Sequence, residues 1–273
     1  MNNIEILENK CRQLRRDIIS MIGTAGSGHP GGSLSIVELM VGIYYTKMRI
    51  DPKNPKMPTR DRFVLSKGHA APCYYAVLAD LGYFDREELS MLRRLHHMLQ
   101  GHPDMKRVPG VDASTGSLGQ GISIAVGMAL GAKTLGQDSD VYVLLGDGEL
   151  QEGQVWEALM AASHYRLDNL TVLIDHNGLQ LDGKNDEIMS LGNLEEKLTA
   201  FGLDAITLSD GNDLDQVISA LHMPSSIEKP RCIVANTVKG KGVSFMENQV
   251  GWHGKAPTKD EMELALKELE EMK

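Results

Sequence analysis

Residues Gly146 to Gly183 carry the clearest evidence for the fold and read GDGELQEGQVWEALMAASHYRLDNLTVLIDHNGLQLDG. A helix-like segment lies between two apolar runs, YVLL before Asp147 and LTVLI before Asp175 and Asn177. A strand, a crossover helix and a second strand form a βαβ unit, in which the two strands are parallel. The stretch therefore predicts a parallel sheet with Asp147 and Asn177 at the ends of adjacent strands.

The same alternation continues along the chain and predicts a doubly wound α/β fold with a mainly parallel sheet. One domain over residues 1–273 is the simplest interpretation, with glycine-rich loops at the end of the sheet where ligands bind in such folds. The region 85–117 reads as irregular. We expect strands at 62–66, 141–147, 170–177, 204–210 and 231–238. We expect one helix that follows SKGHAAP and ends near residue 81, and further helices at 3–22, about 34–45, 118–135, 154–165, 191–202, 213–223 and 258–273.

The composition limits the class of protein. The net charge is -9, which argues against nucleic-acid binding, and 42% of the 273 residues are hydrophobic, as in ordinary globular proteins. Cys11, Cys73 and Cys232 are far apart and form no CxxC pair, which argues against a zinc site or a disulfide framework. No signal peptide or membrane span is apparent. We therefore expect a cytoplasmic protein that binds neither membrane nor nucleic acid.

Asp147 and Asn177 suggest half of a metal site. Their spacing suits neighbouring strand ends, and carboxylate and amide oxygens are ligands that Mg²⁺ or Ca²⁺ accepts. Because Asp147 is the only charged ligand of this pair, a phosphorylated ligand would have to complete the coordination of the metal. Gly146 and Gly148 would let that ligand approach the backbone. The alternative is a pair of turns, because Asp-Gly and Asn-Gly are common turn formers. A second polar strand end at crossover spacing favours the metal site.

Seven motifs give the chain a more specific resemblance. GSGHPGG, FVLSKGHAAP, GHPD, TGSLGQG, GDGELQEGQVWEA, IDHNGLQLDG and KGKG…WHGK occur in this order. In that order they resemble the diphosphate-binding domain of transketolases, over essentially the whole chain. The resemblance implies a thiamine-diphosphate-binding fold.

The resemblance also implies which residues bind the cofactor. Asp147, Asn177 and the backbone carbonyl of Leu179 would hold Mg²⁺, with Ca²⁺ or Mn²⁺ as alternatives. Thiamine diphosphate would contact residues in five of the seven motifs. These expected cofactor-binding residues are His69, Gly116, Ser117, Leu118, Gly148, Asn177, Lys239 and His253.

Four of the nine histidines lie beside glycine in loops that match the family motifs. In transketolases such imidazoles bind sugar hydroxyls and help to move protons, work that suits a neutral imidazole. The expected catalytic residues are therefore His29, His69, His102 and His253. We expect the other five histidines to be ordinary surface or core residues: His96, His97, His164, His176 and His222.

Further charged residues border the same loops, and their roles are less specific. Lys67 and Lys239 suit a diphosphate, whereas Lys241 and Lys255 fit a solvated surface equally well. Glu152 and Glu157 look buried on the crossover helix. They match transketolase glutamates at the dimer interface, and ordinary helix surface is an equal alternative.

The chain ends where the first transketolase domain ends. Transketolases also carry a pyrimidine-type domain, which supplies the glutamate that activates the cofactor, and no segment here resembles it. We therefore expect the N-terminal subunit of a split transketolase, active only with a C-terminal partner in an α2β2 assembly, although a truncated chain would look the same. The expected reaction transfers a two-carbon ketol unit between sugar phosphates, with the pentose phosphates as the default.

Two alternatives remain open at the level of sequence. The first is a subunit of another thiamine-diphosphate enzyme, similar to deoxyxylulose-phosphate synthase or to a 2-oxo-acid dehydrogenase. The second is a cofactor-binding module without catalytic activity. The intact His29, His102 and His253 argue against the second alternative, since a binding module has no need of histidines that face a sugar.

Overall fold

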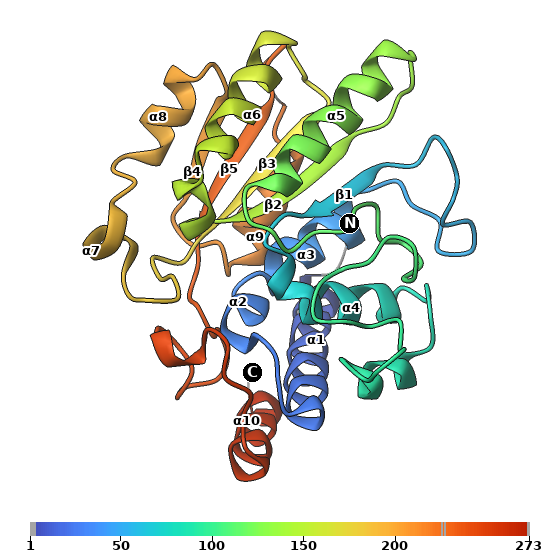
Figure 1. Cartoon of the computed structure of the whole chain (residues 1–273), viewed down its shortest axis with the longest axis vertical. Helices are drawn as coiled ribbons and strands as arrows, with labels where there is room; N and C mark the ends of the chain where they lie inside the picture. The colour runs from blue at the N-terminus through green and yellow to red at the C-terminus, as the bar shows by residue number, and fades with distance from the viewer. Residues whose placement is uncertain (1–3, 225, 227, 272–273) are drawn as a thin grey trace.

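A computed structural model describes residues 4–224, 226 and 228–271, and its centre is a parallel sheet (Figure 1). All four pairings between its strands are parallel, in the order β1-β2-β3-β5-β4. The strands are β1 (Arg62–Leu65), β2 (Val141–Gly146), β3 (Leu170–His176), β4 (Asp204–Leu208) and β5 (Arg231–Asn236). The sheet that the sequence predicted is confirmed, with each strand ending one to two residues earlier than expected.

Helices cover both faces of the sheet, as expected for a doubly wound fold. The chain steps from β1 through β3 to β4 in one direction and then returns to β5. Because crossovers between parallel strands are right-handed, the forward steps place their helices on one face and the return step places its helix on the other. The forward helices are α5 (Gln120–Thr134), α6 (Gly153–His164), α7 (Asn185–Met189) and α8 (Leu194–Ala200), and the return helix is α9 (Leu214–His222).

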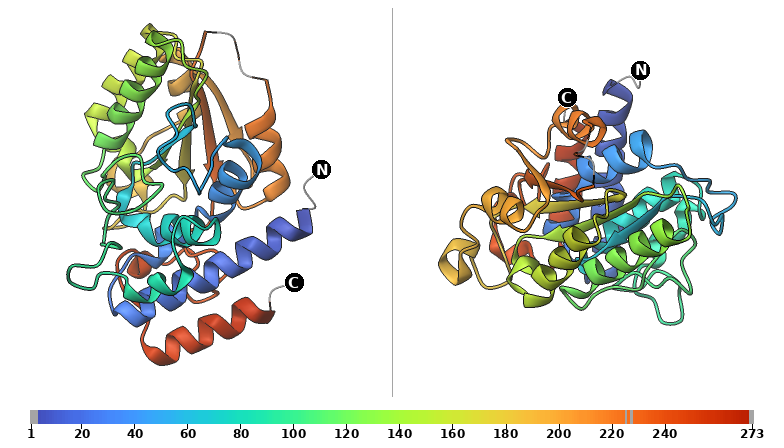
Figure 2. Two further views of the ribbon diagram at one scale, coloured as in Figure 1. Left: turned by 90° about the vertical axis from the view of Figure 1, so that its right-hand side faces the viewer. Right: turned by 90° about the horizontal axis from the view of Figure 1, so that it is seen from above.

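The second face is completed by helices from the N-terminal part of the chain and by the first α-helix of the β1–β2 connection, and the C-terminal helix packs outside them. The long N-terminal helix packs beneath them and the C-terminal helix lies alongside it, away from the sheet (Figure 2). These helices are α1 (Ile4–Ala25), α2 (Pro30–Leu34), α3 (Val37–Gly42), α4 (Ala71–Asp80) and α10 (Lys259–Glu271). Asn3 and residues 272–273 of the two expected terminal helices lie outside the described residues.

Side chains of each strand alternate between two cores. In β2, Val141, Val143 and Leu145 pack with α5 and α6, whereas Tyr142 and Leu144 pack with the helices of the opposite face. Every residue of β2 is buried. The continuous apolar runs in the sequence therefore follow from burial of both faces, as in other doubly wound sheets.

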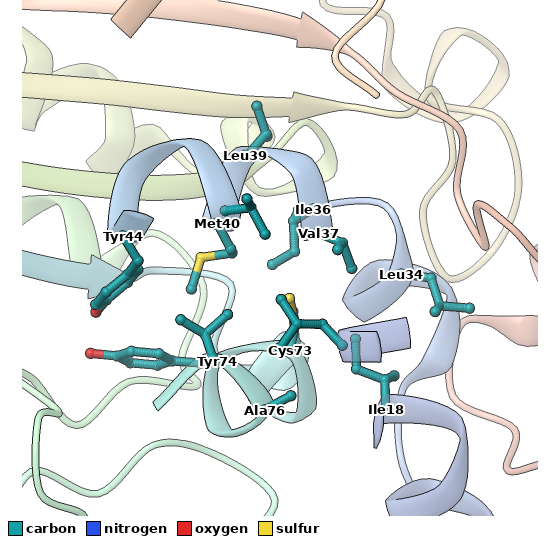
Figure 3. Close-up of a cluster of buried hydrophobic side chains, with 14 of the residues drawn as sticks. Ile18, Leu34, Ile36, Val37, Leu39, Met40, Tyr44, Cys73, Tyr74 and Ala76 are labelled. Atoms are coloured by element: carbon teal, nitrogen blue, oxygen red, sulfur yellow. The ribbon is translucent and has the colours of Figure 1, made fainter. Parts of the chain in front are cut away.

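The helix expected at 34–45 is wrong as one continuous element. The segment instead forms α2, a turn, α3 and a π-helical turn η1 (Ile43–Lys47). The single hydroxyl proton of Ser35, at the break, is shared between the Gly32 carbonyl (3.2 Å) and the buried Asp175 carboxylate (2.8 Å). A side chain that bonds to nearby backbone competes with the helix, and the bond to the distant Asp175 holds Ser35 in that position, so both contacts favour the break. Below it, α3 packs against α1 and α4 (Figure 3).

Short 3-10 helices connect several of the elements. They are η2 (Gly68–Ala70), η3 (Arg86–Met91), η4 (Gly148–Gln151) and η5 (Val250–Trp252). Two of them, η2 and η4, begin two or three residues after β1 and β2 end, so the SKGH and GDG motifs lead from these strands into them. No helix in the described part of the chain is long and apolar enough to cross a lipid bilayer.

Candidate active site at the carboxyl ends of the strands

Asp175 is the buried centre around which the loops assemble. Its carboxylate lies at the end of β3 and is fully buried. It accepts hydrogen bonds from Lys67 Nζ (2.5 Å), Asn177 Nδ2 (2.6 Å) and the hydroxyls of Ser35 (2.8 Å) and Thr237. Burial raises the pKa of Asp175, but Lys67 and the other donors more than offset that effect and hold it below its ordinary value. The sequence placed Asp175 at a strand end without a role for it.

Asp147 and Asn177 come together as their spacing predicted. Asp147 accepts from the backbone N–H groups of Gly148 (2.8 Å) and Gly178 (2.5 Å), so its carboxylate joins the ends of β2 and β3. Asn177 donates to Asp175 through Nδ2, which leaves Oδ1 as the acceptor, here of the Leu179 N–H (3.1 Å). Burial and the charge of Asp175 raise the pKa of Asp147. A cation beside Asp147 would relieve that electrostatic cost, since no described lysine, arginine or histidine forms an ion pair with it.

Lys239 links this pair to the histidines. Its buried Nζ donates to the Leu179 carbonyl (2.8 Å), the third expected metal ligand, and lies 3.0 Å from His253 Nδ1. Burial and the neighbouring Lys67 lower the pKa of Lys239 to about 8. Lys67 and Lys239 thus bring two buried amines to one end of the sheet, a suitable setting for an anion.

Three of the four expected catalytic histidines form one cluster. Ring centroids lie 5.2 Å apart for His29 and His69, 5.8 Å for His29 and His253, and 5.2 Å for His69 and His253. All three are half-buried. Burial, followed by Arg93 for His29 and Lys239 for His253, lowers the pKa of each to about 4. Burial and Lys67 hold the pKa of His69 well below its ordinary value. All three imidazoles are therefore neutral at pH 7.

His102 lies at the exposed edge of this cluster, against the TGSLGQG loop. Gly116 in that loop has φ 143°, and a Cβ atom there would come within 2.8 Å of the His102 ring. Gly68 approaches the same loop so closely that its own Cβ would lie 2.8 Å from the Gly116 nitrogen. Ser117 and Leu118 are exposed beside it. The glycines are therefore needed for the close approach of two loops and an imidazole.

Glu149 is a structural residue of the site that the sequence analysis missed. It is buried on η4 and accepts from the Ser66 hydroxyl (2.5 Å) and from the backbone N–H groups of Gly119 (2.9 Å) and Gly146 (3.1 Å). One carboxylate thus ties together the ends of β1 and β2 and the start of α5. Burial raises the pKa of Glu149, although these donors oppose the rise. Its position directly after GDG was the available signal.

The donor set fits a metal bound through a phosphorylated ligand. Within the described residues, no three His, Cys, Asp or Glu side chains gather in a group that could hold a metal alone. One carboxylate, one amide oxygen and one carbonyl suit Mg²⁺ that takes its other ligands from phosphate and water. Among the described residues, Gln180 Oε1 and the side-chain amide atoms Oδ1 and Nδ2 of Asn185 are buried without hydrogen-bond partners, close to Gly148. Unsatisfied polar atoms there fit a site that a polar ligand completes.

Four of the remaining charged residues lie elsewhere. The Lys255 ammonium lies 4.2 Å above the Trp252 ring and pairs with Glu261, and the Lys241 carbonyl accepts from Arg15 on α1. Glu152 and Glu157, which looked buried in the sequence, are exposed on the outer side of α6. An exposed side chain fits both interpretations of these two glutamates, a dimer interface and an ordinary helix surface.

Four of the five histidines for which we expected no special role contact partners outside the cluster, and the fifth, His96, lies in an exposed turn. His176 lies 2.7 Å from Asn236 Oδ1 and His97 pairs with Glu88, while His164 packs on Tyr165. His222 lies 3.4 Å from the Thr46 hydroxyl, and His96 has φ 65° in an exposed turn.

Comparisons with known proteins agree with this geometry. The family model described as the transketolase thiamine diphosphate binding domain matches residues 5–270. The chain is 45% identical to the 6-deoxy-6-sulfo-D-fructose transketolase subunit SqwG of Clostridium sp. (strain MSTE9), over 97% of this chain and 96% of that protein. It is 39% identical to an apulose-4-phosphate transketolase subunit of Phocaeicola vulgatus, over 98% and 95% of the two chains.

A solved structure gives the same result for the fold. The transketolase of Campylobacter jejuni superimposes with a TM-score of 0.92 at 32% identity, covering 98% of this chain and 43% of that one. The chain thus spans less than half of that transketolase, but nearly all of the two subunits named above. The chain therefore belongs to the transketolase family and corresponds to the thiamine diphosphate binding domain of that family.

Proposed function

We propose that the chain is the N-terminal subunit of a two-chain transketolase, which transfers a two-carbon ketol unit from a ketose phosphate to an aldose phosphate. The observation that carries the proposal is the histidine cluster beside the polar strand ends. The rings of His29, His69 and His253 lie 5.2 to 5.8 Å apart, and Lys239 connects His253 to the Leu179 carbonyl. The near full-length match to two proteins named as transketolase subunits supports the two-chain form.

In this proposal the residues of the chain have three tasks. Asp147, Asn177 and the Leu179 carbonyl hold Mg²⁺, and Asp175 orients Asn177 for that purpose. Gly148 and Lys239 receive the diphosphate, together with His69, Gly116, Ser117, Leu118 and His253. Thiamine diphosphate, when bound, supplies the nucleophilic carbon that carries the two-carbon unit.

The histidines serve the sugar in the proposed site. His29, His102 and His253 have lowered pKa values, so each imidazole is neutral at pH 7 and offers one donor and one acceptor. Such groups can orient hydroxyls, and they can take up or release a proton where the sugar chain breaks. Burial of His29, His69 and His253 limits the access of water to that point.

The proposed partner is a C-terminal subunit that carries the pyrimidine-type domain and the glutamate that activates the cofactor. We propose an α2β2 assembly in the cytoplasm, with the exposed Glu152 and Glu157 at the interface between copies of this chain. The donor and acceptor sugars are an open choice in this proposal. Pentose phosphates, 6-deoxy-6-sulfo-D-fructose and apulose 4-phosphate are the first to test, because the last two occur in the names of similar subunits.

The test is reconstitution. The purified chain alone should show no ketol transfer, and it should gain transfer when the C-terminal subunit, thiamine diphosphate and Mg²⁺ are added. Turnover of pyruvate in place of a ketose would instead indicate another thiamine-diphosphate enzyme. Metal-dependent cofactor binding without turnover of any ketose or 2-oxo acid, after addition of the partner, would support a binding module and contradict the proposal.

A further inference from the structure

Arg93 reaches the histidine cluster from a loop that the structure holds firmly. The Arg93 N–H donates to the Leu99 carbonyl (2.7 Å), and the Gln100 amide donates to the carbonyls of Arg94 (3.0 Å) and His97 (2.6 Å). Arg93 has φ 59°, a left-handed conformation that is uncommon outside glycine. The backbone of residues 93–100 therefore fixes where the Arg93 side chain begins.

The Arg93 guanidinium is directed at His29. Its Nη2 atom lies 3.3 Å from His29 Nδ1, and the guanidinium lies close enough to Gly101 that a Cβ there would come within 3.2 Å of it. Over residues 4–224, 226 and 228–271, Arg93 forms no salt bridge, and the contact with His29 is the one hydrogen bond of its side chain. The backbone hydrogen bonds that close the loop do not explain why the Arg93 side chain has no carboxylate partner and points at an imidazole.

The chemistry of the two side chains decides the state of His29. A guanidinium has five N–H donors and no acceptor, so His29 Nδ1 must accept in this contact. In the neutral ring the proton then lies on Nε2. That edge of the ring lies beside the loop after His253, because a Cβ at Gly254 would come within 3.5 Å of His29 Nε2.

We propose that Arg93 is a positioning residue of this site: it fixes His29 as the Nε2–H tautomer, so that the imidazole presents a donor within the histidine cluster. The inference rests on the proposed function, since the donor is useful only if a sugar oxygen is to be bound there. Sequence reasoning passed over Arg93 because it lies in the irregular region 85–117, where no motif marks it.

The charges around His29 act in the same direction. The groups that face it are Arg93, His69, His102, His253 and Lys239, and none of them is an anion. Protonation of His29 would place an Nδ1–H against the guanidinium donors. Burial and then Arg93 are the leading causes that lower the pKa of His29 to about 4, and Arg93 also lowers the pKa of His102.

The experiment measures the tautomer directly. The complete chain, labelled with ¹⁵N-histidine and combined with its C-terminal partner, thiamine diphosphate and Mg²⁺, is studied by long-range ¹H–¹⁵N NMR, with a His29→Gln variant to assign the signals. Arg93→Met removes the donor at similar side-chain length, and Arg93→Lys keeps a cationic donor. Arg94→Met is the matched control, because Arg94 is the exposed neighbour in the same loop.

The expected results separate positioning from folding. Wild type and Arg94→Met should show one His29 tautomer with Nδ1 unprotonated. Arg93→Met should show mixed tautomers, and the pKa of His29 should rise by about one unit. Its kcat should fall by about ten- to a hundredfold with KM changed less, and added guanidinium ion should restore part of the rate. If Arg93→Met does not fold, Arg93→Lys against Arg94→Met still tests the contact, because lysine has a less rigid donor and should broaden or partly mix the His29 signals.

Two outcomes would overturn the inference. One is an unchanged His29 tautomer and pKa in folded Arg93→Met, and the other is an equal loss of rate in Arg94→Met. Failure of the proposed function looks different. In that case wild type would transfer no ketol unit with its partner, whereas the NMR signals of His29 would still respond to Arg93→Met.

Discussion

Replacement of Asp175 with asparagine should strongly destabilise the chain, because this carboxylate is the buried centre of the strand-end loops. Asp175 is fully buried, and so is the ammonium of Lys67 that pairs with it at 2.5 Å. Asparagine would leave the Lys67 charge without its counter-ion. Its NH₂ group would also face either the Thr237 hydroxyl or the donors of Ser35 and Asn177, which now meet the two carboxylate oxygens of Asp175.

The expected magnitude follows from the burial of the pair. Breaking a buried ion pair by removing one partner costs about 3–5 kcal/mol, since the remaining charge is uncompensated. Total stabilities of natural domains are about 5–15 kcal/mol, so this loss is a large share. A domain of this size loses about 2–4 °C in Tm for each kcal/mol, which predicts a fall in Tm of about 6–20 °C for Asp175→Asn.

Thermal and urea unfolding of the purified chain would measure the effect, with Asp182→Asn as a control. Asp182 is an exposed acid in the loop after β3, and its replacement should change Tm by about 1–2 °C at most. The Lys67→Met/Asp175→Asn double variant should lose less stability than the sum of the two single variants, because no unpaired charge remains.

The pH dependence provides a second readout. Since the pKa of Asp175 is lower in the folded chain than in the unfolded chain, its contribution to stability is present above its ordinary value near 3.8 and is lost as pH falls through the lowered folded pKa. Asp175→Asn should lack that part of the acid limb. A fall in Tm of less than about 2 °C, or strictly additive effects of the two single variants, would refute the reasoning.

Three further predictions concern the site itself. Asp147→Ala should abolish Mg²⁺-dependent binding of thiamine diphosphate in calorimetry while the chain stays folded, at a cost of about 1–3 kcal/mol for two unpaired N–H groups; unchanged affinity would remove Asp147 from the metal site. Because His29 and His253 have pKa values of about 4 when folded and about 6.5 when unfolded, the unfolded chain binds more protons between those values, so urea midpoints should fall as pH drops from 6.5 to 4; a flat profile there would contradict the lowered values. Gly116→Ala, which places a Cβ 2.8 Å from the His102 ring at φ 143°, should cost about 1–3 kcal/mol and lower turnover with the partner, and a variant as stable and active as wild type would contradict the close packing.

Sequence alone was sufficient for the parts of the fold in which local pattern and long-range packing agree. The runs VYVLL and LTVLI are apolar at nearly every position, and β2 and β3 are indeed covered on both faces. The crossover spacing placed Asp147 and Asn177 at adjacent strand ends, where the Asp147 carboxylate now accepts the Gly178 N–H. Both predictions depend on short segments with a regular period.

Local pattern failed where a distant partner decides the outcome. The segment 34–45 has helical periodicity, but Ser35 bonds to Asp175, which is 140 positions away, and the helix breaks there. Glu152 and Glu157 looked buried on the crossover helix, yet both side chains are exposed. The roles of Glu149 and Arg93 depend on loops that follow other elements. Glu149 is marked only by its position after GDG, and no spacing in the sequence indicates Arg93.

The amino-acid pattern was enough to predict the order of strands and helices, the polar residues at the strand ends and the set of histidines in glycine-rich loops. The folded structure was needed to show that His29, His69 and His253 share one cluster, that Asp175 and Lys67 form a buried ion pair and that Arg93 reaches His29. The two kinds of feature differ in the sequence separation of the residues that determine them. Strands and helices follow from neighbours a few residues apart, whereas a buried charge or a tautomer is set by groups that only the folded chain brings within hydrogen-bonding distance.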